Sequence, residues 1–167
     1  MELSGDPENY QLQEVCRNFR GSLITKSGFS VPSEDVIEIS LLRKDLPLTV
    51  TYEEEQLLKA APYSMEGLSG HDPYEVFFGG NHAVVRIDIA NRTGRRLLLL
   101  KDSYANAFVP FLFPDFDRIT MIDPRYYNGD LAAHIRENPY TDVLVLYNIN
   151  TFTEDSALSV LLEEAGR

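Results

Sequence analysis

The sequence has one cysteine, Cys16, three histidines and no tryptophan among its 167 residues. A single cysteine cannot form an intrachain disulfide, and His71, His82 and His134 show no metal-ligand spacing of a familiar kind. We therefore expect neither a metal nor another cofactor. No stretch approaches the ~20 consecutive apolar residues of a membrane-spanning helix. Residues 1–6 also lack the basic and apolar regions of a signal peptide.

Basic residues are scarce as well, with 15 Lys and Arg against 26 Asp and Glu, which gives a formal net charge of -11. Nucleic acids and anionic membranes select basic surfaces, so this excess argues against both as main partners. The one basic cluster, Arg92, Arg95 and Arg96, is interpreted as a solvated turn. An apolar fraction of 44% indicates a globular chain and not a disordered one.

The first half of the chain has an irregular pattern. Short strands are predicted over residues 10–16, 35–42 and 48–52, with turn formers at 26–28 and 31–33. The acidic stretch 52–56 is predicted to start a helix that runs to residue 60, and 61–80 to be mostly loop. This pattern suits an antiparallel lobe or long insertions around a core. We expect residues 1–167 to form one domain, in which this irregular, β-rich part covers 1–80.

The second half, 81–167, predicts an α/β core. Strands are expected over 83–90, where Val85, Ile87 and Ile89 share one face, and over 97–100, an apolar run buried on both faces. Further strands are expected over 119–122 and 143–147. Helices are expected over 103–112, 130–138 and 156–165. Strands that alternate with helices imply parallel β-α-β units, so the predicted fold class is α/β.

The ends of these parallel strands carry the polar residues most suited to chemistry, because ligands bind beyond the carboxyl ends of strands in open parallel sheets. Those ends hold Lys101-Asp102-Ser103, Asp123-Pro124-Arg125 and Tyr147-Asn148. Ser103 lies where a buried strand turns into a helix, the position of a nucleophilic serine near an oxyanion-stabilising helix N-terminus. The alternative is that Ser103 is only the N-cap of that helix.

A nucleophilic serine needs a base, usually a histidine oriented by a carboxylate. The sequence contains no Asp-x-His or Asp-x-x-His element. His71 and His82 are the histidines expected nearest to the active edge, and each can equally be a surface or packing residue. The sequence thus predicts a nucleophile without an evident base.

Several segments resemble the bacterial DHHW family. The most specific are the runs Lys101-Asp102-Ser103-Tyr104-Ala105-Asn106 and Asp123-Pro124-Arg125-Tyr126-Tyr127. The likeness extends over residues 97–112, 122–127 and 142–148, and upstream over 19–23, 26–28 and 78–81. It therefore covers most of the chain.

The DHHW family is similar to SGNH-fold proteins, including alginate O-acetyltransferases of bacterial surface polysaccharide assembly. The resemblance implies part of an SGNH or flavodoxin-like sheet, with Ser103 as the nucleophile. It further implies that the Ser103 N–H and Asn81 form an oxyanion hole, with Asp102 and Asn106 in support. Asp102-Ser103 is similar to the Gly-Asp-Ser of related esterases, with Lys101 in the glycine position.

The chain lacks the Asp-His-His-Trp motif that names the family, whose Asp and His would complete the triad. In the family this motif precedes the region seen here. We therefore expect the chain to be the C-terminal portion of a larger, extracytoplasmic SGNH-like domain that acts on acylated polysaccharide as an esterase or O-acetyltransferase. Alone it should turn over little, and its open sheet edge could self-associate. The alternative is a non-catalytic glycan- or protein-binding module with a degenerate site.

Overall fold

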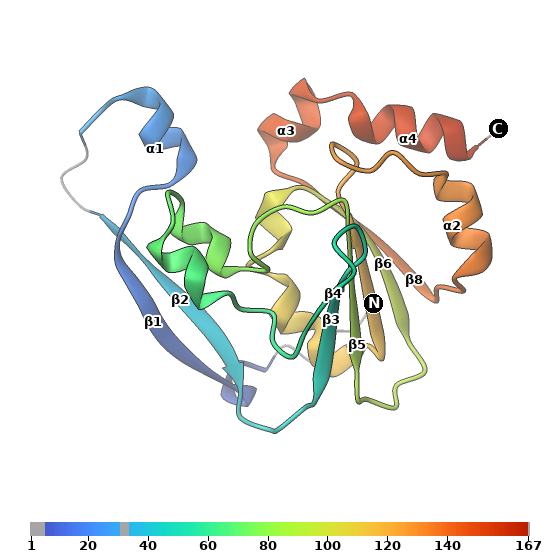
Figure 1. Ribbon diagram of the computed structural model, residues 1–167, viewed down its shortest axis with the longest axis horizontal. Coiled ribbons are helices and arrows are strands. Elements are labelled where there is room, and N and C mark those ends of the chain that lie inside the picture. The colour runs from blue at the N-terminus through green and yellow to red at the C-terminus, as the bar shows by residue number, and fades with distance from the viewer. Residues whose placement is uncertain (1–5, 31–33, 167) are drawn as a thin grey trace. The chain divides into compact units, whose positions relative to one another are not determined.

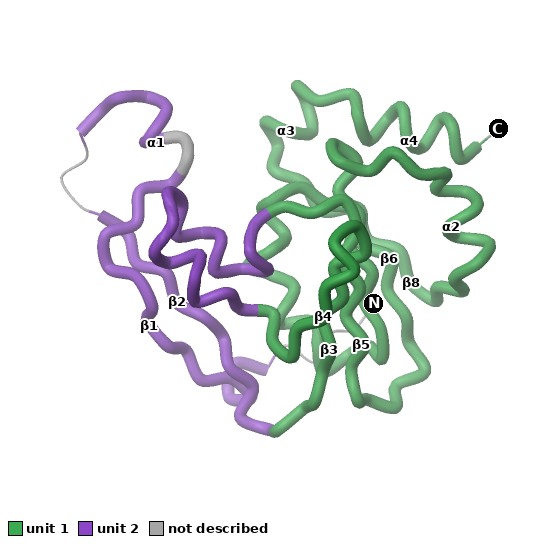
Figure 2. The backbone as a smooth tube through the Cα atoms, in the orientation of Figure 1, with its two compact units in different colours: residues 1–5, 45–62, 81–167 green, residues 6–44, 63–80 purple. Residues whose placement is uncertain are grey.

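The computed structural model describes residues 6–30 and 34–166. They form two compact units (Figure 2): unit 1 comprises residues 45–62 and 81–166, and unit 2 comprises residues 6–44 and 63–80. Unit 1 thus combines residues from both halves of the sequence. The predicted turn at 31–33 and the segment Met1–Gly5 lie outside the described residues. No helix in the described part is long and apolar enough to cross a membrane.

Unit 2 is built on an antiparallel strand pair, as the first half of the sequence predicts. Strands β1 (Tyr10–Phe19) and β2 (Asp35–Leu42) pair with Tyr10 opposite Leu42. The Tyr63 hydroxyl donates a 2.6 Å hydrogen bond to the Ser40 carbonyl. The remaining elements are the short helices η1 (Pro7–Asn9), α1 (Ser22–Ser27), η2 (Met65–Ser69) and η3 (Pro73–Val76).

Unit 1 contains a six-stranded mixed sheet in the order β4-β3-β5-β7-β6-β8 (Figure 1). Strands β6, β7 and β8 are parallel, while β3, β4 and β5 add antiparallel pairs. The predicted α/β class with parallel β-α-β units in the second half is therefore confirmed. The strand bounds are β3 (Leu48–Tyr52), β4 (Leu57–Lys59), β5 (Val84–Ile89), β6 (Arg96–Lys101), β7 (Arg118–Ile122) and β8 (Asp142–Leu146).

The apolar run of β6 forms the centre of this sheet. All four residues from Leu97 to Leu100 are buried, as predicted for a strand covered on both faces. Leu98 and Leu100 join an apolar cluster with Leu131 of α2 (Leu131–Glu137) and Leu158 of α4 (Ala157–Ala165). Because β6 is held on both faces, its carboxyl end, which leads into Ser103, has a fixed position in unit 1.

Two predicted helices are wrong. The acidic stretch after Tyr52 forms a turn, and the chain then returns as β4, paired antiparallel with β3. Residues 103–112 form no continuous α-helix. Residues 103–105 form the 3-10 helix η4 (Ser103–Ala105), 106–108 form a turn, and 109–112 begin the 3-10 helix η5 (Val109–Asp115). Pro110 and Pro114 cannot donate the backbone hydrogen bonds of a regular helix. A helix that was not predicted, α3 (Ile149–Glu154), precedes α4.

Candidate active site

Ser103 is the first residue of η4 and is separated from the end of β6 by Asp102 alone. Its side chain is half-buried, at the carboxyl edge of the parallel strands. The cap of η4 is Asp102 and not Ser103, because the Asp102 carboxylate accepts the Tyr104 N–H. The interpretation of Ser103 as an N-cap is therefore wrong. A single 3-10 turn also lacks the dipole expected of a longer helix, so that source of oxyanion stabilisation does not apply.

Asp102 joins the ends of two neighbouring strands. Its carboxylate is 1% exposed and accepts the Tyr104 N–H at 2.9 Å and the Asn148 N–H at 3.0 Å. Tyr104 follows β6, and Asn148 follows β8. A buried carboxylate with two backbone donors holds both segments together, since either N–H would otherwise need another acceptor. The turn that carries Ser103 is thereby tied to the end of β8.

The predicted supporting amides, Asn81 and Asn106, lie next to each other. The Asn106 side chain is 1% exposed, and its Nδ2 donates to Asn81 Oδ1 at 3.4 Å. Asn81 itself is exposed, just before β5. By accepting at Oδ1, Asn81 is oriented with its own Nδ2 turned away from Asn106, where it can donate to a ligand oxygen.

A buried charge network lies on the same edge. Asp123, at the end of β7, is 0% exposed, and its carboxylate accepts hydrogen bonds from Arg125 Nε at 2.8 Å and Nη2 at 2.6 Å. Lys101, the last residue of β6, is 1% exposed and places its Nζ 3.6 Å from Asp123 Oδ2. With Asp102, the network contains two cations and two carboxylates.

Burial lowers the pKa of Lys101 from its ordinary value to about 8, although the nearby Asp123 carboxylate opposes this shift. Between about pH 8 and pH 10 the unfolded chain then binds more protons than the folded one, so the free energy of unfolding should rise with pH by about 1 kcal/mol per unit. Lys101→Met should lack this rise. Urea unfolding of both proteins across this range measures the difference. Parallel pH profiles for the two proteins would show that Lys101 does not titrate in this range.

Both histidines of unit 1 have partners within that unit. His82 Nδ1 lies 3.2 Å from Glu55 Oε1, and its ring packs 4.5 Å from the ring of Tyr52. His134 Nε2 lies 2.7 Å from the Tyr140 hydroxyl. The third histidine, His71, belongs to unit 2. The described residues also contain no group of His, Cys, Asp and Glu suited to hold a metal ion.

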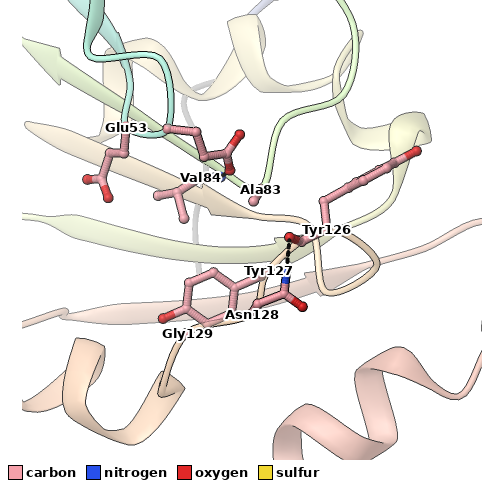
Figure 3. Close-up of a pocket in the computed structure, with 8 residues that line it drawn as sticks. Glu53, Ala83, Val84, Tyr126, Tyr127, Asn128 and Gly129 are labelled. Atoms are coloured by element: carbon pink, nitrogen blue, oxygen red, sulfur yellow. Dashed lines mark hydrogen bonds between the residues drawn. The ribbon is translucent and has the colours of Figure 1, made fainter.

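An open pocket of about 380 Å³ lies beside the turn that follows Asp123 (Figure 3). Ala83 and Val84 line it at the start of β5, with Glu53 on one side and Tyr127 on the other, and Glu54 is also a lining residue. Glu54 Oε1 accepts the Val84 N–H at 3.1 Å. Carboxylates can accept hydrogen bonds from sugar hydroxyls, and an aromatic ring beside them can pack against the apolar face of a sugar ring. The other lining residues are Tyr126, Asn128 and Gly129.

The sequence predicted the site edge but missed the contacts within it. Lys101, Asp123 and Asn148 were recognised only as residues at strand ends, and the structure brings Lys101 to Asp123 and Asn148 to Asp102. The available signal was a charged residue at the end of each of two apolar strands. This signal does not show which charged residues contact each other until the strand order β7-β6-β8 is known.

The fold is similar to solved structures of longer proteins. A DHHW family protein from Eubacterium siraeum matches with a TM-score of 0.76 and 24% identity, over 93% of this chain and 53% of that chain. Bacillus cereus PatB1 with a sulfonyl adduct matches with a TM-score of 0.67 and 18% identity, over 94% of this chain and 52% of that one. Another PatB1 structure gives a TM-score of 0.64 and 19% identity, over 94% and 54%.

These matches confirm the resemblance to the DHHW family at the level of the fold. The chain spans about half the length of the solved structures that it matches. No protein-family model matches the sequence, and no curated protein does either.

Proposed function

We propose that Ser103 is the nucleophile of an SGNH-like acyl-ester hydrolase or O-acetyltransferase that acts on acylated cell-surface glycan. The observation that carries this proposal is the turn at Ser103: a half-buried serine two residues after the end of the buried strand β6, in a turn braced by Asp102. A fixed serine at the carboxyl edge of parallel strands suits nucleophilic attack on a bound ester. The adjacent amides of Asn106 and Asn81 offer a donor for the resulting oxyanion.

The reaction has two balanced steps. Ser103 Oγ attacks the acyl carbonyl carbon and gives its proton to a base, and the ester C–O bond breaks as the leaving alcohol takes that proton. The acyl-serine is then attacked by water, which makes the protein an esterase, or by a glycan hydroxyl, which makes it a transferase. The second nucleophile's proton passes through the same base, and Ser103 is restored.

The base in this scheme is a histidine supplied from outside residues 1–167, as the resemblance to the DHHW family implies. Without that base the chain should retain only the residual rate that oxyanion stabilisation provides. PatB1 carries a sulfonyl adduct in one of its structures. Sulfonyl reagents modify activated nucleophiles, and this supports nucleophilic chemistry in the shared fold.

Acetylation of Ser103 tests the proposal. The 167-residue protein is incubated with p-nitrophenyl acetate, with and without imidazole as an external base, and the acetyl group is located by peptide mass spectrometry. We expect an acetyl-serine at 103 that forms faster with imidazole. A deacetylated glycan that shortens the lifetime of this adduct identifies a transferase, whereas a lifetime set by water identifies an esterase.

The pocket beside Tyr127 favours a second function, that of a non-catalytic glycan-binding module. The same experiment separates the two. If Ser103 stays unmodified while a surface polysaccharide raises the melting temperature of both the natural protein and Ser103→Ala, binding is the function. Modification of Ser103 together with no thermal shift excludes the binding module and supports the enzyme.

A further inference from the structure

Asp123 is the group through which several segments of the site edge are joined. Its backbone N–H donates to the Ala83 carbonyl at 3.0 Å, and its carbonyl accepts the N–H groups of Tyr126 and Tyr127, each at 3.0 Å. Its carboxylate binds Lys101 and Arg125. All the polar groups of this completely buried residue are therefore engaged, with Ala83 and Lys101 in two other segments and with residues 125–127 of its own turn.

Two of those segments carry the proposed chemistry. Lys101 lies two residues before Ser103 in the chain, and Ala83 lies two residues after Asn81. Asp123 is thus tied through its side chain to the strand that delivers the nucleophile, and through its backbone to the strand that follows the proposed oxyanion donor. These ties set the spacing between the two segments at the carboxyl edge.

Stability alone does not account for this arrangement. Removing two charges from water costs several kcal/mol per ion, and apolar side chains of similar volume often stabilise a core as well or better. In the chain, Lys101 and Asp123 directly follow the buried apolar residues Leu100 and Ile122. The ion pair instead favours arrangements of the two strand ends that keep Lys101 Nζ close to the Asp123 carboxylate.

We propose that Asp123 is a positioning residue, which acts through Lys101 and Ala83 to hold the Ser103 turn at a fixed place relative to Asn81. This inference rests on the proposed function for its chemical meaning. Its structural content is independent of that function, because the turn has reporters of its own. The N–H groups of Tyr104 and Asn148 both donate to Asp102 and exchange with solvent only when the turn opens.

The test compares Asp123→Asn with a matched control, Asp142→Asn. Asp142 also accepts two hydrogen bonds from an arginine, Arg95, but lies at the start of β8, at the opposite end of the sheet. Amide exchange is measured by NMR. In Asp123→Asn we expect the Tyr104 and Asn148 amides to exchange at least about tenfold faster. The control variant should leave both rates unchanged.

Two amides serve as an internal reference, since the N–H groups of Thr93 and Gly94 donate to Asp117 away from the site edge. Their exchange should be the same in the natural protein and in Asp123→Asn. Equal acceleration of all four amides would show global destabilisation and overturn the proposal. Unchanged exchange at Tyr104 and Asn148 in a folded Asp123→Asn protein would overturn it too.

The double variant Lys101→Met/Asp123→Leu distinguishes a positioning role of Asp123 from the simple cost of leaving the Lys101 charge unbalanced. It removes both buried partners, so we expect it to regain stability relative to Asp123→Asn while the Tyr104 and Asn148 amides still exchange faster than in the natural protein. Restored slow exchange would mean that only charge balance mattered. If Ser103 of the natural protein is never acetylated, the proposed function fails, and amide exchange alone still decides whether Asp123 positions the turn.

Discussion

Replacing Ser103 with alanine is expected to reduce labelling by a fluorophosphonate probe to background, because the proposed nucleophile is then missing. Labelling is carried out with imidazole present and followed by fluorescence in a gel. Ser103 is half-buried, so loss of its hydroxyl should leave the fold intact. Circular dichroism of the variant checks this.

A matched control for Ser103→Ala is Ser156→Ala. Ser156 also stands at the entry to a helix, α4, and its side chain makes no capping hydrogen bond there. Its replacement should leave labelling unchanged. Equal labelling of the natural protein and Ser103→Ala would place the reactive group elsewhere and remove the basis of the proposed enzyme.

Replacing Asp102 with alanine is expected to lower the free energy of unfolding by about 3 kcal/mol. The buried carboxylate accepts two backbone N–H groups, and each buried donor left without an acceptor costs about 1–3 kcal/mol. Asp102→Asn, which keeps one acceptor oxygen, should lose less. Urea unfolding at neutral pH measures both values.

Asp72→Ala provides the comparison for Asp102→Ala. Asp72 also caps a 3-10 helix, η3, by accepting the Tyr74 N–H at 3.0 Å, but it is exposed to water. Water can replace that acceptor, so the loss should be about 1 kcal/mol or less. If the two variants lose the same free energy of unfolding, Asp102 does not hold the Ser103 turn to the end of β8.

Most strands could be predicted from the sequence because their buried faces leave a simple pattern of apolar residues. Val85, Ile87 and Ile89 alternate with Arg86 and Asp88, and the structure buries the first set while leaving the second partly exposed. The run from Leu97 to Leu100 has no polar alternation because both of its faces are covered. These patterns are local, so a single sequence reveals them.

Other features depended on competition between local forces. Asp102 and Ser103 are both good caps, and only the backbone geometry decides that the carboxylate takes the Tyr104 N–H. Apolar spacing over 103–112 suggested a helix, but the prolines at 110 and 114 favour 3-10 turns. In the stretch after Tyr52, Leu57 and Leu58 remain partly or largely exposed in β4, so no burial pattern marked the strand.

The contacts of the site could not be predicted at all, since they join residues far apart in the sequence. Lys101 and Asp123 meet because β6 and β7 pair in parallel with Leu100 opposite Ile122. A shift of one residue in that register would turn one of the two side chains to the other face of the sheet. The chemistry of each residue was visible in the sequence, but the pairing was not.

Strand β8 has an outer edge with which no strand among residues 6–30 and 34–166 pairs. Residues 143–149 carry no charge, and Val143 and Val145 are 64% and 44% exposed. Natural edge strands are usually blunted by lysine, proline or a bulge, and this one has none of these between residues 143 and 149.

That edge has a consequence for the solution behaviour of the protein. A net charge of -11 keeps molecules apart at low salt. At 0.1 M salt, this repulsion is largely screened beyond a distance of about 10 Å. Raising the ionic strength should therefore bring residues 143–146 of β8 in two molecules within reach of each other. Colloidal stability would then depend less on the free energy of unfolding than on the ionic strength of the buffer. Pairing between molecules would begin at the edge of β8.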